Sequence, residues 1–142
     1  MEIFINVPGE AVPQARPRVT HCGTYDPPKC KAYKQKVGLY AKTAMRGKEP
    51  LRGPIKMSVI VYRGIPKSWT KKKKVAAMLD DIYPTTKPDI DNLLKGIMDA
   101  LKGICWYDDA QVVSVYARKA YEVSPRVHLT IWSGSGEENE HD

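Results

Sequence analysis

Five aspartates fall within residues 87–113 of a chain whose formal net charge is +7. Asp89 and Asp91 follow a proline and are two apart, whereas Asp108 and Asp109 are adjacent. If three of these carboxylates converge, they repel one another unless a cation lies between them. Oxygen-only ligands select Mg²⁺ or Mn²⁺ over zinc or copper. The residue types therefore predict a divalent-metal site that lowers the pKa of a bound water and stabilises charge on a phosphate.

The segment between the two aspartate pairs has the pattern of an amphipathic helix. Pro88 disfavours a helical conformation for the residue before it, so Asp89 is expected at the junction of loop and helix. Asp91, Lys95 and Asp99 follow at four-residue steps and line a polar face. The apolar stripe expected to be buried has the spacing i, i+3, i+4 and i+7 and consists of Leu94, Ile97, Met98 and Leu101.

Each of these polar residues also has a purely structural interpretation. Asp91 near the start of the helix would complement the helix dipole. That role does not explain Asp89, which precedes the helix, or the pair Asp108 and Asp109 at the start of the next strand. Lys95 has two open interpretations: it pairs with an acid of the site, or it stabilises the transition state and the leaving oxygen.

The charge is polarised along the chain. Residues 1–79 carry 17 Lys and Arg against 4 Asp and Glu, whereas residues 80–142 carry 6 against 12. A positive field of this size favours a polyanionic partner, although solvated lysines also keep proteins in solution. Two interpretations of the consecutive lysines Lys71–Lys74 therefore stay open: a solvated helix face, or contacts with nucleic-acid phosphates.

The periodicity predicts a single α+β domain with a mixed or antiparallel sheet packed against helices. Strands are predicted at residues 2–7, 54–64, 111–122 and 126–132, where apolar residues alternate. Helices are predicted at 30–47, after an N-cap at Ser68, and after Asp89, while 9–29 is expected to be a loop. Further side chains expected to be buried or to anchor these elements are Tyr33, Val37, Tyr40, Ala41, Ala44, Ile55, Met57, Val59, Val61, Trp69, Val75, Met78, Leu79, Val113, Val115, Ala117, Val127, Leu129 and Ile131.

The remaining composition indicates an intracellular protein. The three cysteines Cys22, Cys30 and Cys105 are odd in number and lack a paired C-x-x-C motif, so reduced thiols are expected rather than disulfides or zinc. The apolar stretches are shorter than a membrane span, and the N-terminus lacks the pattern of a secretory signal. No membrane association is expected, and the polar residues 133–142 are predicted to form a flexible acidic tail.

A longer motif unites the acidic residues. D-x-D-N-L-x-K is followed by D-A-L and then by D-D-x-Q-V within residues 86–113. This run resembles the RusA family of Holliday junction resolvases, which phages and prophages typically carry. The segments PQARPRV, YKQKV and PKSWTKKKK are similar to the basic front part of such proteins. The resemblance covers residues 1–132, which we take as the RusA-like domain.

The resemblance implies a homodimeric endonuclease that depends on Mg²⁺, with Mn²⁺ as a substitute, and that makes paired symmetric nicks in a four-way DNA junction. Transferred by motif, the catalytic acids and metal ligands fall on Asp89, Asp91 and Asp109, and the essential lysine falls on Lys95. Asp108 matches the flanking acid, and the spacing leaves open which of Asp108 and Asp109 is the third ligand. The implied site of action is the cytoplasm of a bacterial host, for a phage- or prophage-encoded protein. Residues expected to contact DNA phosphates are Arg16, Arg18, Lys29, Lys34, Lys71, Lys72, Lys73 and Lys74.

Two other functions fit parts of the pattern. Phosphatases and sugar-nucleotide transferases also use D-x-D, but they normally place it at the end of an apolar strand, whereas here it follows PTTKP. A basic DNA-binding protein without catalysis would require the acids to be helix caps and loop residues.

Overall fold

A four-stranded mixed sheet is the centre of the protein in the computed structural model, which describes residues 1–15, 18–21 and 23–134. Its strands lie in the order β1 (Glu2–Pro8), β6 (Arg126–Ser133), β4 (Ile55–Gly64) and β5 (Val112–Glu122). The pairs β1–β6 and β6–β4 are antiparallel, and β4–β5 is parallel. The predicted α+β class with a mixed sheet is therefore confirmed.

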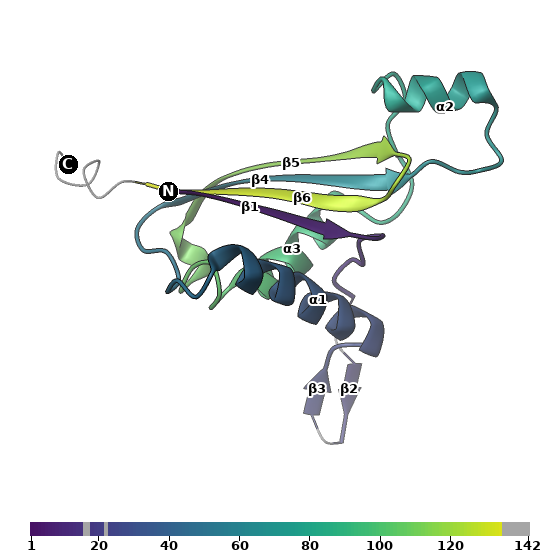
Figure 1. Cartoon of the computed structure of the whole chain (residues 1–142). Helices are drawn as coiled ribbons and strands as arrows, with labels where there is room; N and C mark the ends of the chain where they lie inside the picture. Colours follow the sequence, from purple (N-terminus) through teal and green to yellow (C-terminus); the bar gives the residue numbers. More distant parts are fainter. Residues whose placement is uncertain (16–17, 22, 135–142) are drawn as a thin grey trace.

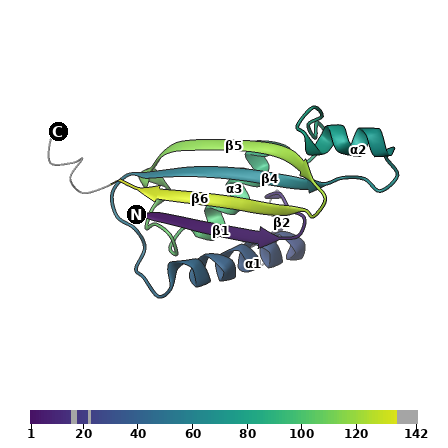
Figure 2. The same ribbon diagram turned by 45° about the horizontal axis from the view of Figure 1, so that its top comes forward.

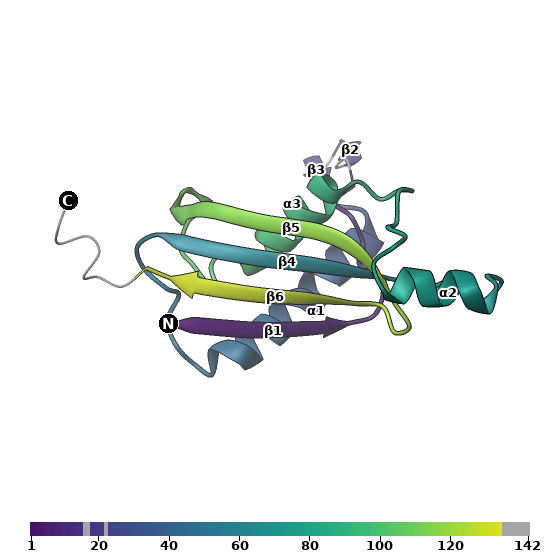
Figure 3. The same ribbon diagram turned by 90° about the horizontal axis from the view of Figure 1, so that it is seen from above.

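Two helices cover one face of this sheet. Helix α1 (Pro28–Met45) and helix α3 (Ile90–Leu101) pack against each other on the same side of the sheet, below the strands in Figure 1; in Figure 2, α3 lies behind them. Strands β1, β4 and β6 turn alternate apolar side chains toward the helices, and these side chains fill the space between the two layers. The other face of the sheet has no helix across its centre (Figure 3).

Two smaller elements project from this body. Helix α2 (Lys71–Met78) lies beyond one end of the sheet on the crossover from β4 to β5, while the hairpin of β2 (Arg18–Thr20) and β3 (Gly23–Tyr25) extends past the N-terminal end of α1 (Figure 1). The hairpin corrects the predicted loop at 9–29, because its three-residue strands are too short to give an alternating pattern. No helix in the described ranges is both long and apolar enough to cross a membrane.

The core predictions are right in the central strands. Seven side chains expected inside β4 and β6 are all buried: Ile55, Met57, Val59, Val61, Val127, Leu129 and Ile131. In α1, Tyr33, Val37 and Ala41 are buried as predicted, but Tyr40 is exposed and Ala44 is only partly buried. The buried stripe of α3 includes Ile97 and Leu101 but is rotated toward Leu93, so that Leu94 and Met98 are only partly buried.

The predictions for the peripheral elements were less accurate. Thr70, rather than Ser68, caps α2 by accepting a hydrogen bond from the Lys73 backbone N–H. The proposed anchors Val75, Met78 and Leu79 are exposed, and Ala77 is the buried residue of this helix. On β5, Val113 and Val115 are exposed as well, while Ala117 is partly buried. Helix α2 projects beyond the sheet and β5 is an edge strand, so each has a side that no other element covers.

Candidate active site

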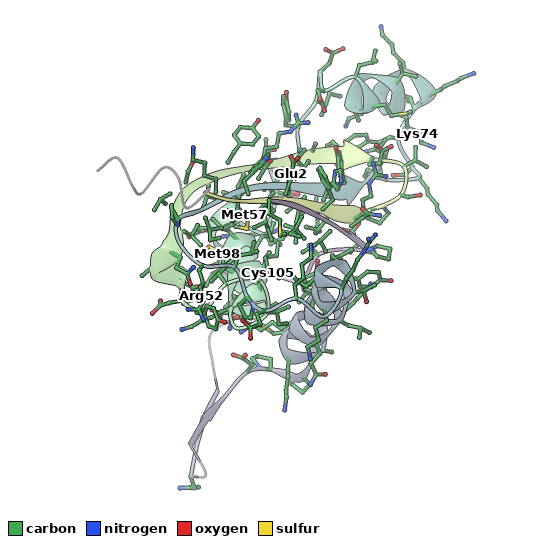
Figure 4. All side chains as sticks on the ribbon, turned by 60° about the vertical axis from the view of Figure 1, so that its left-hand side comes forward. Glu2, Arg52, Met57, Lys74, Met98 and Cys105 are labelled. Atoms are coloured by element: carbon green, nitrogen blue, oxygen red, sulfur yellow. The ribbon has the colours of Figure 1, made fainter. Side chains whose placement is uncertain are left out.

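An open depression beside α3 brings together acids that are far apart in sequence. Asp91 and Lys95 reach it from the polar side of α3, with Asp99 one turn further on. Asp109 reaches it from the 3₁₀ turn η1 (Asp109–Gln111), just before β5. Leu94 and Met98 form the apolar part of the lining; Figure 4 labels Met98 beneath the sheet. The predicted meeting of the helix acids with the acids ahead of β5 is thus present for Asp91 and Asp109.

The two adjacent aspartates have different surroundings. The Asp109 carboxylate accepts a hydrogen bond of 2.8 Å from the indole N–H of Trp106, which is completely buried. The Asp108 carboxylate instead accepts a hydrogen bond of 3.0 Å from the Ala110 backbone N–H and caps η1. Of the two adjacent aspartates, only Asp109 lines the depression. This geometry favours Asp109 over Asp108 as a ligand.

Gln111 fixes the turn that carries these aspartates. Its side-chain oxygen accepts hydrogen bonds from the backbone N–H groups of Tyr107 and Asp108, at 2.8 and 2.9 Å. Its side-chain NH₂ donates to the carbonyls of Leu51 and Gly53, at 2.9 and 3.0 Å. One amide therefore joins the turn to the chain ahead of β4. The spacing Asp108-x-x-Gln111 is a capping-box signature that could have been read from the sequence.

Asp89 occupies the N-cap position of α3, as the position of Pro88 predicted, but its side chain makes no cap hydrogen bond. Its two carboxylate oxygens instead contact the Lys87 ammonium at 2.9 and 3.0 Å. Lys87 is 83% exposed, and pairs of this kind are worth about 0–1 kcal/mol. The carboxylate is therefore held weakly and can be released toward a competing cation.

The donor set fits a hard cation. Within the described ranges, no three His, Cys, Asp or Glu side chains lie close enough together to hold a metal ion. Asp89 is engaged with Lys87, and Asp108 caps η1. Mg²⁺ commonly takes only one or two carboxylates and fills its remaining positions with water and phosphate oxygens. Asp91 and Asp109 supply two such carboxylates, and oxygen ligands suit hard cations better than softer metals.

A lysine between two acids ties the base of the hairpin to α3. Lys34 on α1 contacts Asp26 at 2.9 Å and Asp99 at 3.1 Å, and the Gln14 side chain also donates to Asp26. The Lys34 and Gln14 hydrogen bonds lower the pKa of Asp26 below its ordinary value of 3.8. Burial alone would lower the pKa of Lys34, but the two carboxylates outweigh burial and raise it.

The chain ahead of the hairpin also lies directly on α3. The Gln14 backbone N–H donates to the Asn92 carbonyl at 3.0 Å. A Cβ atom at Gly96 would lie 3.4 Å from the Gln14 backbone nitrogen, so glycine permits this close approach. The segment leading to the predicted DNA-contact residues is therefore attached to the same helix that carries Asp91 and Lys95.

The predicted DNA-contact residues have different environments. Lys29 is exposed in the first turn of α1, whereas the Lys34 ammonium is engaged by Asp26 and Asp99. The run Lys71–Lys74 lies on α2, away from α3 (Figure 4), with Lys73 over the Trp69 ring at 4.0 Å. Arg18 is part of strand β2, and Arg16 lies outside the described residues.

The thiols play no part in this site. Cys30 and Cys105 are free and buried, and burial raises the pKa of Cys105 to about 12. The prediction of reduced thiols is confirmed for these two residues. Cys22 and the tail from residue 135 onward lie outside the described residues.

Residues 8–132 match the family described as "Endodeoxyribonuclease RusA". The chain belongs to the RusA family. It is 43% identical over 135 residues to "Uncharacterized protein YqaN" of Bacillus subtilis strain 168. The matched region covers 91% of this chain and 94% of that protein. It is 31% identical over 81 residues to "Crossover junction endodeoxyribonuclease rusA" of Lactococcus phage r1t, which covers about half of each chain. The RusA resemblance of residues 86–113 is therefore confirmed, and the family is one of DNA endonucleases.

Sequence reasoning missed several residues that hold the site in place. Trp106, Lys119 and Gln14 act on it through hydrogen bonds from buried or half-buried positions. The partners of Lys119 and Gln14 lie on separate elements, whereas Trp106 lies only three residues before Asp109. Gln111, with its local capping-box spacing, carries a signal that can be read from the sequence.

We expect replacement of Lys34 by Met to lower the free energy of unfolding by about 1–3 kcal/mol, because Asp26 and Asp99 lose a shared charged partner. The matched change Lys29→Met, at an exposed position of the same helix, should stay within about 0.5 kcal/mol. Urea unfolding of both variants measures the difference.

The same comparison has a defined pH dependence. Asp26, with its lowered pKa, contributes stability above pH 3.8 that is lost as the pH falls through the folded-state value. Lys34, with its raised pKa, contributes below pH 10.5 and loses this as the pH rises through its folded-state value. The effect of Lys34→Met should therefore be constant from about pH 5 to 10 and shrink outside that window. A difference that does not change in acid would contradict the assigned ion pairs.

Proposed function

We propose that this protein is a Mg²⁺-dependent endodeoxyribonuclease that resolves four-way DNA junctions by paired symmetric nicks. The observation that carries the proposal is the depression in which Asp91, Lys95 and Asp109 come together from α3 and η1. Membership of the RusA family and the similarity to a crossover junction endodeoxyribonuclease of a lactococcal phage support the choice of substrate. That phage relative also supports a phage or prophage origin and action in the cytoplasm of a bacterial host.

Asp91 and Asp109 would hold the metal ion, with Mn²⁺ as a possible substitute, and Asp89 would join them after leaving Lys87. When bound, the ion supplies an acidified water and stabilises charge that builds on the scissile phosphate. Trp106 holds one oxygen of Asp109 through its indole N–H and so leaves the other oxygen for the ion. Asp108 keeps its role as the cap of η1.

Lys95 would stabilise the charge on the phosphate and the leaving oxygen. It is exposed at the depression, and among the described residues no acidic side chain forms an ion pair with it. This favours the catalytic interpretation over pairing with a site acid. Asp99, one turn away, is already paired with Lys34, so its role is to hold the hairpin base.

The proposed DNA contacts come from several parts of the chain. Arg16 lies outside the described residues, Arg18 is part of β2, and Lys29 lies at the exposed start of α1. Lys71–Lys73 are exposed on the projecting helix α2, where they add positive charge beyond the end of the sheet. Such contacts are independent of base sequence and weaken strongly with salt.

We also propose that the enzyme is a homodimer formed across the uncovered sheet face. This face exposes large apolar side chains from three strands, including Phe4 at 60%, Tyr116 at 59% and Trp132 at 38%. Figure 3 looks onto it, with α1 and α3 behind the strands.

The size of this face suits a dimer interface, because strand β4 alone has 10 residues. A strand of that length spans roughly 33 Å. Two copies meeting here can bury much of the about 800 Å² per partner that stable complexes use. A two-fold dimer suits the near two-fold symmetry of a four-way junction.

The two alternative functions are less well supported. Asp89 and Asp91 lie at the start of a helix, not at the end of an apolar strand as in the phosphatase-type D-x-D motif. A binding protein without catalysis would use its acids as caps, which describes Asp108 but not Asp89 or Asp109.

We expect Asp109→Asn to reduce Mg²⁺-dependent cutting of a synthetic four-way junction by more than about a hundredfold. Loss of an outer-shell partner alone costs up to about a hundredfold, and Asp109 is proposed to bind the ion directly. Asn can still accept the Trp106 hydrogen bond but removes the charge. The matched variant Asp108→Asn should cut within about threefold of wild type, because Asn caps as well as Asp.

Asp89→Asn should lose cutting and keep junction binding. The products are followed on denaturing gels with and without Mg²⁺, beside a linear duplex. The opposite ranking of the two neighbours would transfer the ligand role to Asp108.

Replacing Lys71–Lys74 by Ser should flatten the dependence of log affinity on log salt by about 1–3 units, because each lost phosphate contact removes about 0.9. Affinities are measured by fluorescence anisotropy with a catalytically inactive Asp89→Asn background. The matched double variant Lys42→Ser with Lys48→Ser, near the C-terminal end of α1 and at the other end of the sheet (Figure 1), should keep the wild-type slope. An unchanged slope in the first variant would assign the four lysines to a solvated face.

Phe4→Glu should convert the dimer into a monomer, since two charged side chains would be buried in the interface. Leu39→Glu, at a 64%-exposed position on α1, is the matched control and should stay dimeric. Sedimentation velocity separates the two states. A dimeric Phe4→Glu variant would be incompatible with the sheet-face interface, and a monomeric wild type with the dimer itself.

A further inference from the structure

The loop that leads into Asp89 has almost no hydrogen bonds of its own. Within the described part of the chain, the main-chain groups of residues 82–88 form no hydrogen bond with any other main-chain group. Pro84 is buried, but the rest of the loop is mainly exposed. A loop of this kind has little to fix its path. Yet its last residue precedes Asp89, whose position the proposed metal site requires.

One side chain from the sheet supplies the missing contacts. The Lys119 ammonium on β5 donates hydrogen bonds of 3.0 Å to both the Thr86 carbonyl and the Pro88 carbonyl. Lys119 is paired in register with Val61, a buried residue of β4 that faces the helices. The lysine therefore extends from the helix-covered side of the edge strand and holds the loop on both sides of Lys87.

The chemistry of these contacts suits a structural tie. An ammonium has three donors and no acceptor, so one lysine can hold two carbonyls at once. Hydrogen bonds from a charged donor are about twice as strong as neutral ones. Lys119 is half-buried, which reduces competition from water, and no acidic side chain among the described residues forms an ion pair with it.

The two ends of the Asp89 backbone are then held by different parts of the protein. Lys119 fixes the Pro88 carbonyl on one side, and the Leu93 N–H fixes the Asp89 carbonyl at 3.1 Å on the other. The peptide units on both sides of Asp89 are thus anchored, while its carboxylate is bound only to the exposed Lys87. The carboxylate is thus the least constrained part of Asp89, because its only side-chain partner is an exposed lysine.

We propose that Lys119 is a positioning residue that fixes the main chain ahead of Asp89, so that the Asp89 carboxylate can join Asp91 and Asp109 around the metal ion. The inference rests on the proposed metal-dependent function and adds to it a residue outside the acidic motif. Lys119 acts through the loop and does not itself contact the ion.

The test compares Lys119→Met, Lys119→Arg and Lys36→Met with the wild-type chain. Lys36 is the matched control because its ammonium also donates to a main-chain carbonyl, that of Pro8, but far from Asp89 along the chain. Thermal unfolding verifies that each variant is folded. Mn²⁺ affinity is measured by isothermal titration calorimetry, and the rate at which proteinase K cuts between Tyr83 and Asp89 is followed by mass spectrometry.

Lys119→Met should bind Mn²⁺ at least about tenfold more weakly, the loss expected for an outer-shell partner, and should be cut faster between Tyr83 and Asp89. Lys119→Arg should recover most of both properties, and Lys36→Met should match wild type. Wild-type Mn²⁺ affinity together with an unchanged cutting rate in Lys119→Met would overturn the inference. If the wild-type chain binds no Mn²⁺, the proposed metal site fails. The proteinase measurement then decides separately whether Lys119 holds the loop.

Discussion

The packing of one side of α3 against the sheet is the constraint on which the site depends. Leu93, Ile97 and Leu101 are almost fully buried, and their removal from water fixes the rotation of the helix about its axis. Once that rotation is set, Asp91 and Lys95 must face outward, because they lie on the opposite side of the same helical turns. The arrangement of charged groups is therefore a consequence of the apolar core.

A second constraint brings Asp109 to the same place. The chain leaves α3, turns at Gly103 with a positive φ of 82°, and buries Trp106 completely before η1. The buried indole N–H needs an acceptor and finds it in Asp109. Gln111 joins the turn to the chain ahead of β4. One acid from the helix and one from the turn are thus placed side by side by groups that have no charge of their own.

The other acids of this region each have a partner that reduces repulsion at the site. Asp99 and Asp26 share Lys34, Asp108 caps η1, and Asp89 is held by Lys87. Two carboxylates, Asp91 and Asp109, remain in the depression without a cationic partner among the described residues. This distribution explains how a positively charged protein can retain a local negative site for a cation while its surroundings attract a phosphate backbone.

The α+β class, the central strands, the helix after Asp89 and the family could all be predicted from the sequence, because alternation, helical spacing and the D-x-D-N-L-x-K and D-D-x-Q-V motifs are local patterns. It did not determine which of Asp108 and Asp109 faces the depression, that Lys34 is engaged by two acids, or that Val113, Val115 and the apolar residues of α2 are exposed. Those features depend on which elements lie against one another and which faces receive a second layer. Hydrogen bonds such as Gln14 to Asn92 and Lys119 to Pro88 form between segments that are far apart in sequence and meet only by tertiary packing. They could not be predicted from the sequence, because neither partner's local sequence specifies the other.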